Sequence, residues 1–379
     1  MKLAIIRREC GFDSGGAEAY CANVSARLSE KGYDVTILAD KGDVRGPDFR
    51  RAMVRGRGSI AKNISFFKSV EELLSKGDFD ITYGLSRVAP VDVLRISDPL
   101  HAAWLDLGYS GRSWLRRIMP RHRMLLMLEK KAVNGASHIV VNSSLVKKHL
   151  MSYYDVSPER ITVVYNGVDT ARFRPVSPDI RSEMRKELGI GSDEIVLLFA
   201  GSDLRRKGFG PLAEAFCRLS ADREGDGRSL LRLVVAGASG DRKYERFFMG
   251  HGLSEKVRWL GYRNDMENIY GISDMFVLPT RYDPFANTTV EAMSCGVPVV
   301  TTSLNGASEI YSGEFSWLVT GHGTCEDLFS AISAFLALPP EKRHALGHAV
   351  RKVAEEYSWN RHVDCLESLF RRVWQHKTI

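Results

Sequence analysis

The feature that most constrains the fold is an alternation of short apolar runs with helical patterns, which starts twice along the 379 residues. In the first half, an apolar run at residues 3–6 precedes apolar residues spaced three and four apart, which form one face of a helix. Gly32 stands where that helix should end, and another apolar run follows it. Repeated strand–helix units of this kind predict an α/β protein with helices covering parallel sheets.

The expected strands fall into two groups. The first group comprises residues 3–6, 35–38, 81–83, 93–96, 138–141 and 161–164, and the second comprises 194–200, 230–236, 257–260, 275–278, 297–301 and 317–319. Between the groups, residues 172–178 contain two prolines and no period, so we expect the domain junction there. Two doubly wound domains facing each other would place the carboxyl ends of their strands across one cleft, where such sheets bind ligands.

Composition excludes several other classes. No stretch approaches 18 uninterrupted apolar residues, so we expect no membrane span, and charge interrupts the first apolar run too early for a secretory signal. The six cysteines are scattered without a CxxC pair, which argues against a zinc site and a disulfide framework and favours a reducing cytoplasm.

The net charge of +7 is unevenly distributed. Residues 1–170 hold 26 Lys and Arg against 19 Asp and Glu, and residues 171–379 hold 27 of each kind. This asymmetry indicates an anionic partner for the first half. A nucleic-acid- or other anion-binding protein is therefore an alternative, although the chain lacks a helix-turn-helix signal, a zinc site and an aromatic-rich sheet motif.

Two turns are suited to anions. The turn at residues 11–18 contains Gly15 and Gly16 just before a helical pattern, and glycines let backbone N–H groups approach a phosphate. In the second half, Arg206 and Lys207 follow a strand and could neutralise a diphosphate. A plain tight turn and solvated surface charge are the alternatives. Neither turn has the GxGxxG spacing, which argues against an NAD-dependent oxidoreductase, the other enzyme class considered.

The segment 279–300 carries the most specific pattern. Asp283 and Glu291 stand eight positions apart around a polar turn. A helix that begins at Thr288 or Thr289 would offer free N–H groups to a phosphate. Glu291 would then lie about one turn into the helix and could accept hydrogen bonds from two sugar hydroxyls. The alternative is that Asp283 only forms the turn and Glu291 is an exposed helix residue.

These motifs together resemble the retaining GT-B glycosyltransferases of family 4, most closely the lipopolysaccharide-core glucosyltransferase I type. Members carry a Glu-x7-Glu motif before a Gly-x-Pro run, and this chain matches it with Asp283 in place of the first Glu and Ala286 in place of the usual Gly. The further matches are Gly15-Gly16, Arg206-Lys207, residues 166–169 and residues 261–263. The resemblance runs nearly end to end.

The resemblance implies a GT-B fold of two Rossmann-like domains, residues 1–172 for the acceptor and 173–357 for the nucleotide sugar. A C-terminal helix, residues 358–379, would cross back to the first domain. The implied reaction moves a hexose such as glucose from a nucleotide diphosphate donor, UDP by preference, to a cell-envelope glycan or glycolipid such as lipopolysaccharide core. It implies retention at the anomeric carbon and neither a catalytic metal nor another cofactor.

The resemblance also implies the site residues. Asp283 would contact the donor sugar, and Glu291 would bind the ribose hydroxyls. The other donor-binding residues it implies are Gly15, Gly16, Arg206, Lys207, Tyr262, Arg263, Asn287, Thr288 and Thr289. Asp98 and His101 follow the strand at 93–96 and are expected at the cleft, where the family often has a histidine beside the transferred sugar. The alternative is that His101 is simply structural.

Residues 112–128 interleave arginines with large apolar side chains, and Pro120 argues against one long helix. Basic residues contribute about 1 kcal/mol each near an anionic leaflet, where Trp and Met can lie at the headgroup boundary. We expect a cytoplasmic protein with peripheral contact to the inner face of the membrane through this segment. The alternative is an ordinary half-buried helix with solvated arginines.

Overall fold

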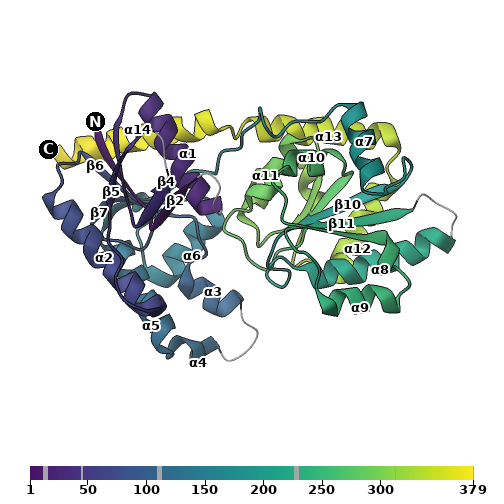
Figure 1. Ribbon diagram of the computed structural model, residues 1–379, viewed down its shortest axis with the longest axis horizontal. Coiled ribbons are helices and arrows are strands. Elements are labelled where there is room, and N and C mark those ends of the chain that lie inside the picture. Colours follow the sequence, from purple (N-terminus) through teal and green to yellow (C-terminus); the bar gives the residue numbers. More distant parts are fainter. Residues whose placement is uncertain (12–15, 44–45, 109–112, 226–229, 312, 379) are drawn as a thin grey trace. The chain divides into compact units, whose positions relative to one another are not determined.

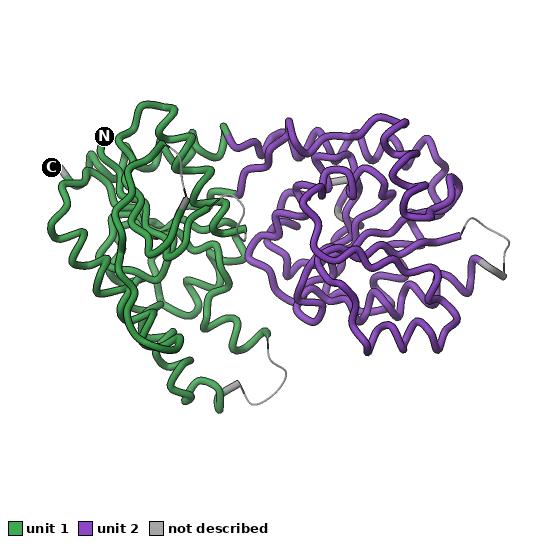
Figure 2. Tube along the Cα trace, in the orientation of Figure 1, with its two compact units in different colours: residues 1–165, 360–379 green, residues 166–359 purple. Residues whose placement is uncertain are grey.

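The computed structural model describes residues 1–11, 16–43, 46–108, 113–225, 230–311 and 313–378. The chain forms two compact units, coloured separately in Figure 2. Unit 1 comprises Met1–Tyr165 and Asn360–Ile379, and unit 2 comprises Asn166–Trp359. Each unit contains a parallel sheet with helices in its connections, so the expected fold of two Rossmann-like domains is confirmed.

The units divide at 165/166, earlier than the expected 172/173. Nδ2 of Asn166 donates to Oδ1 of Asn287 over 2.7 Å, and the N–H of Val168 donates to the carbonyl of Tyr357 over 2.8 Å. These bonds lie within unit 2, so the chain joins this unit before the proline-containing segment that marked the junction in the sequence. The second division lies at 359/360, close to the expected 357/358.

The sheet in the described part of unit 1 has seven parallel strands in the order β5-β3-β1-β6-β7-β8-β9. Their bounds are β1 (Lys2–Ile6), β3 (Asp34–Ala39), β5 (Asp48–Arg51), β6 (Ile81–Gly84), β7 (Val91–Ile96), β8 (Ala136–Val141) and β9 (Ile161–Val163), and β2 (Glu9–Gly11) pairs separately with β4 (Lys41–Asp43). After β1, the chain adds β3 and β5 on one side of β1, and it then adds β6 to β9 on the other side of β1. The direction of winding therefore reverses between β1 and β6, where open α/β sheets bind ligands.

Figure 1 shows α1 (Gly16–Glu30) and α14 (Trp359–Thr378) along one side of this sheet and α2 (Gly58–Lys76) and α5 (Pro120–Asn134) along the other. The other helices of unit 1 are α3 (His101–Leu107), α4 (Ser113–Arg117), α6 (Ser144–Tyr154) and the short η1 (Pro158–Arg160). The predicted apolar face of α1 is buried, and Gly32 follows the helix with φ +85°, which glycine adopts without steric cost.

The C-terminal helix α14 packs on unit 1, as the resemblance implied. The ring of Phe370 lies edge-on to that of Tyr83 in β6, with their centroids 5.0 Å apart. Nε2 of His362 lies 2.8 Å from the hydroxyl of Tyr20 in α1, and its Nδ1 lies 2.6 Å from the carbonyl of Tyr165. The helix thus closes a buried polar network over the middle of the sheet.

The sheet in the described part of unit 2 has six parallel strands in the order β12-β11-β10-β13-β14-β15. Their bounds are β10 (Ile195–Ala200), β11 (Leu231–Ala236), β12 (Val257–Gly261), β13 (Met275–Leu278), β14 (Val299–Thr302) and β15 (Val319–Thr320). All four residues of β13 are buried, as expected for a central parallel strand that helices cover on both faces.

The connections of unit 2 hold its helices. These are α7 (Pro178–Glu187), α8 (Phe209–Gly225), α9 (Arg242–Gly250), α10 (Met266–Gly271), α11 (Asn287–Ser294), α12 (Cys325–Ala337) and α13 (Pro340–Glu355), with the short η2 (Ser254–Lys256), η3 (Gly306–Ile310) and η4 (Gly313–Leu318). Because the strands are parallel, the turns after β10, β12, β13 and β14 all emerge at one edge of the sheet. These turns contain the predicted donor-binding residues of the second half.

Candidate functional site

Arg206 and Lys207 converge on Asp283 at the carboxyl edge of the unit 2 sheet. Nη1 of Arg206 lies 2.9 Å and Nζ of Lys207 lies 2.8 Å from the same Oδ2 of Asp283. Burial alone would raise the pKa of the Asp283 carboxyl, but the charges of Lys207 and Arg206 outweigh it and hold that pKa below its usual range. The site therefore contains an ionised carboxylate that fixes two cations.

Backbone contacts place the two cations after β10. The carbonyl of Arg206 accepts hydrogen bonds from the N–H of Arg281 and the hydroxyl of Thr280, both in the turn after β13. Gly208 has φ +79°, and a Cβ on it would lie 1.8 Å from the carbonyl oxygen of Pro279. Only glycine lets the two turns approach so closely, and this approach brings Lys207 to Asp283.

Glu291 lies on α11 and accepts a hydrogen bond of 3.0 Å from the hydroxyl of the buried Tyr270. Burial raises the pKa of the Glu291 carboxyl, and the opposing effects of Tyr270, Arg172 and Lys207 do not cancel that shift. Tyr270 uses Oε2, and no described residue is recorded as a partner of Oε1. This carboxylate therefore has capacity to accept further hydrogen bonds.

The start of α11 distinguishes the two threonines that the sequence left as alternatives. Thr289 is fully buried, its hydroxyl accepts from Nδ2 of Asn305, and its N–H donates to the carbonyl of Ala286. The hydroxyl of Thr288 is also buried but has no hydrogen-bond partner among the described residues. Thr288 is thus the threonine whose hydroxyl no described residue satisfies, and Thr289 is a structural support.

Asn305 is a supporting residue that the sequence analysis missed. Its Oδ1 accepts from the N–H groups of Ala286 and Ala307, and its Nδ2 donates to the hydroxyls of Thr289 and Thr301. It therefore joins the ends of β13 and β14 to the start of α11. A lone asparagine after a strand carries no local signal for this role.

Tyr262 and Arg263 follow β12 at the same edge. The side chain of Tyr262 is exposed, and the guanidinium of Arg263 forms two hydrogen bonds with Asp265, of 2.8 and 2.6 Å. Because Asp265 already binds the guanidinium of Arg263, a ligand would contact the backbone of this turn rather than that side chain. Among the described residues, no group of three or more His, Cys, Asp or Glu is placed to hold a metal ion.

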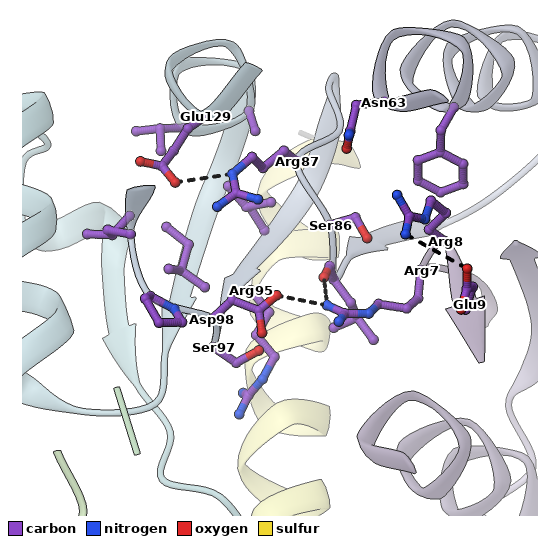
Figure 3. Close-up of a pocket in the computed structure, with 18 of the residues that line it drawn as sticks. Arg7, Arg8, Glu9, Asn63, Ser86, Arg87, Arg95, Ser97, Asp98 and Glu129 are labelled. Atoms are coloured by element: carbon purple, nitrogen blue, oxygen red, sulfur yellow. Dashed lines mark hydrogen bonds and ion pairs between the residues drawn. The ribbon is translucent and has the colours of Figure 1, made fainter. Parts of the chain in front are cut away.

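One of the predicted residues of unit 1, Asp98, lines a cavity of about 230 Å³ (Figure 3). Asp98 lines it after β7 and accepts a hydrogen bond of 3.2 Å from Nη1 of Arg7, whose Nη2 donates to Glu18. Gly16 is the first residue of α1, and a Cβ there would meet nothing within 4 Å. Gly15 lies outside the described residues.

His101 is not among the residues that line this cavity. It is the first residue of α3, its side chain is buried, and its Nε2 lies 2.9 Å from Nδ1 of His122. Burial, followed by the charge of Arg87, lowers the pKa of His101 to about 4. The expected position after β7 is correct, but the imidazole is neutral near pH 7 and is directed into the protein.

Two family profiles match the chain in sequence order. The profile described as Glycosyltransferase Family 4 matches residues 14–172, and that described as Glycosyl transferases group 1 matches residues 180–353. A D-inositol 3-phosphate glycosyltransferase from Saccharomonospora viridis is 32% identical, over 95% of this chain and 89% of the relative. The chain belongs to the glycosyltransferase family that these two profiles describe as family 4 and group 1. It is therefore an enzyme that uses a nucleotide sugar, which replaces the oxidoreductase and nucleic-acid-binding alternatives.

Solved structures show the same GT-B fold. WaaG, a glycosyltransferase involved in lipopolysaccharide biosynthesis, has a TM-score of 0.78 at 19% identity, covering 97% of this chain and 99% of WaaG. HepE from Anabaena in complex with UDP and glucose has a TM-score of 0.74 at 18% identity, covering 97% of this chain and 99% of HepE. At such identities the likeness establishes the fold of this glycosyltransferase and leaves its substrates to be argued from its own residues.

Proposed function

We propose that this glycosyltransferase transfers a hexose, glucose or a close relative, from a UDP-sugar to a cell-envelope glycan or glycolipid with retention at the anomeric carbon. The observation that carries the donor proposal is the pair of cations on Asp283, at the sheet edge where α11 also begins. Loss of a sugar leaves negative charge on a diphosphate oxygen. Fixed cations stabilise that charge without reorganising during the reaction.

Arg206 and Lys207 would hold the diphosphate together with the first N–H groups of α11 and the hydroxyl of Thr288. That hydroxyl is buried without a partner among the described residues, and a phosphate oxygen would satisfy it. Asn287 would contribute its N–H at the start of the helix. Asp283 is shorter by one methylene than the family's usual Glu, so its carboxylate would reach less far toward the donor sugar.

Glu291 would bind the ribose hydroxyls through the oxygen that Tyr270 leaves open. A sugar hydroxyl donates to an ionised carboxylate more strongly than to a neutral acid, so ribose binding would favour the charged form. The backbone at Tyr262 and Arg263 would hold the base. The open space next to the Cα of Gly16, at the start of α1, is compatible with its predicted part in donor binding.

The acceptor we propose is a cell-envelope glycan or glycolipid such as lipopolysaccharide core. The likeness to WaaG supports this choice at the level of fold. A phosphorylated cyclitol is the second candidate, because the relative from Saccharomonospora viridis is a D-inositol 3-phosphate glycosyltransferase. Both acceptors are polyols that can carry phosphate.

We also propose that the enzyme works at the cytoplasmic face of the membrane. In α4 and the turn after it, Trp114 and Ile118 are 62% and 61% exposed. Basic side chains follow on α5, where Arg121 and Arg123 are exposed. The described residues contain no helix with the length and apolar character needed to cross a bilayer, so the proposed contact is peripheral.

Calorimetric titration of UDP tests the donor site. We expect Glu291→Ala to weaken UDP binding by roughly 10-fold or more, because a charge-assisted hydrogen bond contributes about 1.5–3 kcal/mol. Glu183→Ala, on the exposed surface of α7 in the same unit, is the matched control and should bind UDP as the wild type does. If Glu291→Ala binds UDP, GDP and ADP with wild-type affinity, the ribose assignment is wrong.

A further inference from the structure

The cavity of unit 1 lies where open α/β sheets bind ligands, and the donor proposal does not account for its charges. Its walls come from the turns after β1, β6 and β7, on either side of the point where the winding reverses, and from α2 and α5. Its volume of about 230 Å³ is close to the lower end of the range for small-molecule sites, about 300–1,000 Å³.

Three of the four acidic residues that line the cavity, Glu18, Asp98 and Glu129, have close partners. Glu18 and Asp98 both pair with Arg7, and the side chain of Arg7 is only 12% exposed. Glu129 is buried and accepts four hydrogen bonds, from Nε of Arg87, the N–H groups of His101 and Ala102, and the hydroxyl of Tyr154. Two of these donors belong to the first turn of α3, which stabilises a carboxylate on its own.

Arg87 keeps its two terminal nitrogens available in this arrangement. Only its Nε is engaged, at 3.2 Å from Glu129, and no described residue partners either terminal nitrogen. Figure 3 shows Nε of Arg87 facing Glu129 and the terminal nitrogens on the other side of the guanidinium group. Glu129 therefore orients the guanidinium plane without occupying the two nitrogens that bind a phosphate in bidentate fashion.

A second cation and an acceptor-rich wall complete the site. Arg8, 43% exposed, lines the same cavity, and its nearest carboxylate is that of Glu9 at 3.8 Å. Asp98, which also lines the cavity, is half exposed and has oxygens that can accept from hydroxyl groups. The lining thus offers guanidinium nitrogens to an anion and carboxylate oxygens to hydroxyl groups.

We infer that this cavity binds the acceptor through a phosphate monoester on a polyol, with the phosphate on Arg87 and the hydroxyls toward Asp98. The inference deepens the proposed function and rests on it, since it specifies the acceptor of the same reaction. Glu129 acts as a positioning residue, because it holds Arg87 by Nε.

The test is calorimetric titration of the full chain with glucose 6-phosphate and myo-inositol 1-phosphate, each beside its dephosphorylated counterpart. We expect the phosphorylated compounds to bind more tightly, and Arg87→Ala to weaken them by roughly 10- to 100-fold, the effect of losing charge-assisted hydrogen bonds. Arg57→Ala, an exposed arginine outside the cavity, should bind them as the wild type does. Arg87→Lys keeps the charge but loses the fork, so its affinity should fall between the two.

Measuring the UDP affinity of Arg87→Ala tests the donor site independently of the acceptor cavity. It also shows whether the variant is folded. We expect this affinity to equal that of the wild type, and absence of UDP binding by the wild type would overturn the donor proposal instead. Vesicles of phosphatidylcholine with and without phosphatidylinositol 4-phosphate distinguish a lipid headgroup from a soluble compound, and binding that depends on Arg87 in either form supports the inference. Equal affinity for phosphorylated and dephosphorylated compounds without vesicle binding, or wild-type affinity in Arg87→Ala, would overturn it.

Discussion

Nζ of Lys207 lies 2.8 Å from Oδ2 of Asp283, and these side chains are only 12% and 10% exposed. The ammonium group is therefore fixed before any ligand arrives, and the carboxylate that fixes it also pairs with Arg206. Removing one partner of a buried ion pair usually leaves an uncompensated charge and destabilises the protein. Here the second cation limits that cost, which allows catalysis and stability to be tested separately.

We expect Lys207→Ala to lower turnover by about 10²–10³-fold, the usual effect of removing one donor that stabilises a charged transition state. The melting temperature should change little, because Arg206 still compensates Asp283 over 2.9 Å. Turnover at saturating donor is the measurement. Arg205→Ala removes an adjacent exposed cation and should retain activity. Unchanged turnover in Lys207→Ala would exclude a role for this residue at the diphosphate.

The sequence predicts most of the sheets because parallel strands are continuous apolar runs. The strand β5 (Asp48–Arg51) escaped prediction for the opposite reason, since all four of its residues are exposed and only its backbone pairing with β3 defines it. The turn at Pro120 was also predictable, and the chain divides there into α4 and α5, with Pro120 at the first position of α5.

From the sequence, site residues could be placed at the ends of strands, but their contacts with one another could not be predicted. Asp283 and Lys207 each follow a strand, which places them at one edge, but their ion pair depends on the close approach at Gly208. His101 also follows a strand. Its N–H, however, donates to Glu129, 28 residues later, and this bond fixes the start of α3. Contacts between residues far apart in the chain decide such orientations, and no local pattern encodes them.

Glu291→Gln should stabilise the free enzyme at neutral pH. Burial raises the folded-state pKa of Glu291, so the folded protein resists its ionisation, and the wild type loses stability as pH rises through that raised value. Below the ordinary value of 4.5 the carboxyl is protonated in both states, and the substitution should then have little effect. We expect a gain of the order of a few degrees in melting temperature at about pH 8.

Melting temperatures of Glu291→Gln and the wild type at about pH 4 and pH 8 provide the measurement, with Glu183→Gln as the control. The affinity of Glu291→Gln for UDP should fall while the stability of the variant rises. This combination is expected when a buried charge destabilises the fold but binds the ligand. A variant equally destabilised at both pH values would refute this account of the carboxylate.

Stability of the whole protein should fall as pH is lowered from about 6.5. Burial lowers the pKa of His362 to about 3, with a further contribution from the charge of Arg95, and burial lowers that of His101 to about 4. The unfolded chain therefore binds these protons below 6.5 while the folded protein does not. Each such proton costs up to about 1.4 kcal/mol per pH unit until the folded-state pKa is reached.

Urea unfolding between about pH 4.5 and 7.5 measures this slope. His362→Gln removes one titrating group while its amide can still bond to Tyr20, so the slope should decrease. His376→Gln, near the end of the same helix and exposed, should leave it unchanged. A slope in His362→Gln equal to that of the wild type would mean that the buried imidazole does not control the acid sensitivity.

The exposed apolar and basic residues of α4 and α5 should bind anionic membranes. Within the predicted segment 112–128, Met124, Leu125 and Leu128 are buried in a cluster with Phe67, so this part belongs to the core. Trp114 and Ile118 are the most exposed of the large apolar residues in the described part of this segment, ahead of Leu115, Met119 and Met127. Liposome flotation should therefore show weaker recovery of the double variant Trp114→Ser and Ile118→Ser on anionic vesicles.

Charge and apolar surface can be separated in the same assay. Arg121→Ser and Arg123→Ser should each lower partitioning by about fivefold, the equivalent of about 1 kcal/mol per basic residue, and high salt should mimic them. Met249→Ser, which removes an exposed apolar side chain in unit 2, should float as the wild type does. Equal recovery on neutral and anionic vesicles would reject membrane contact, because the proposed attraction requires the negative surface potential of the leaflet.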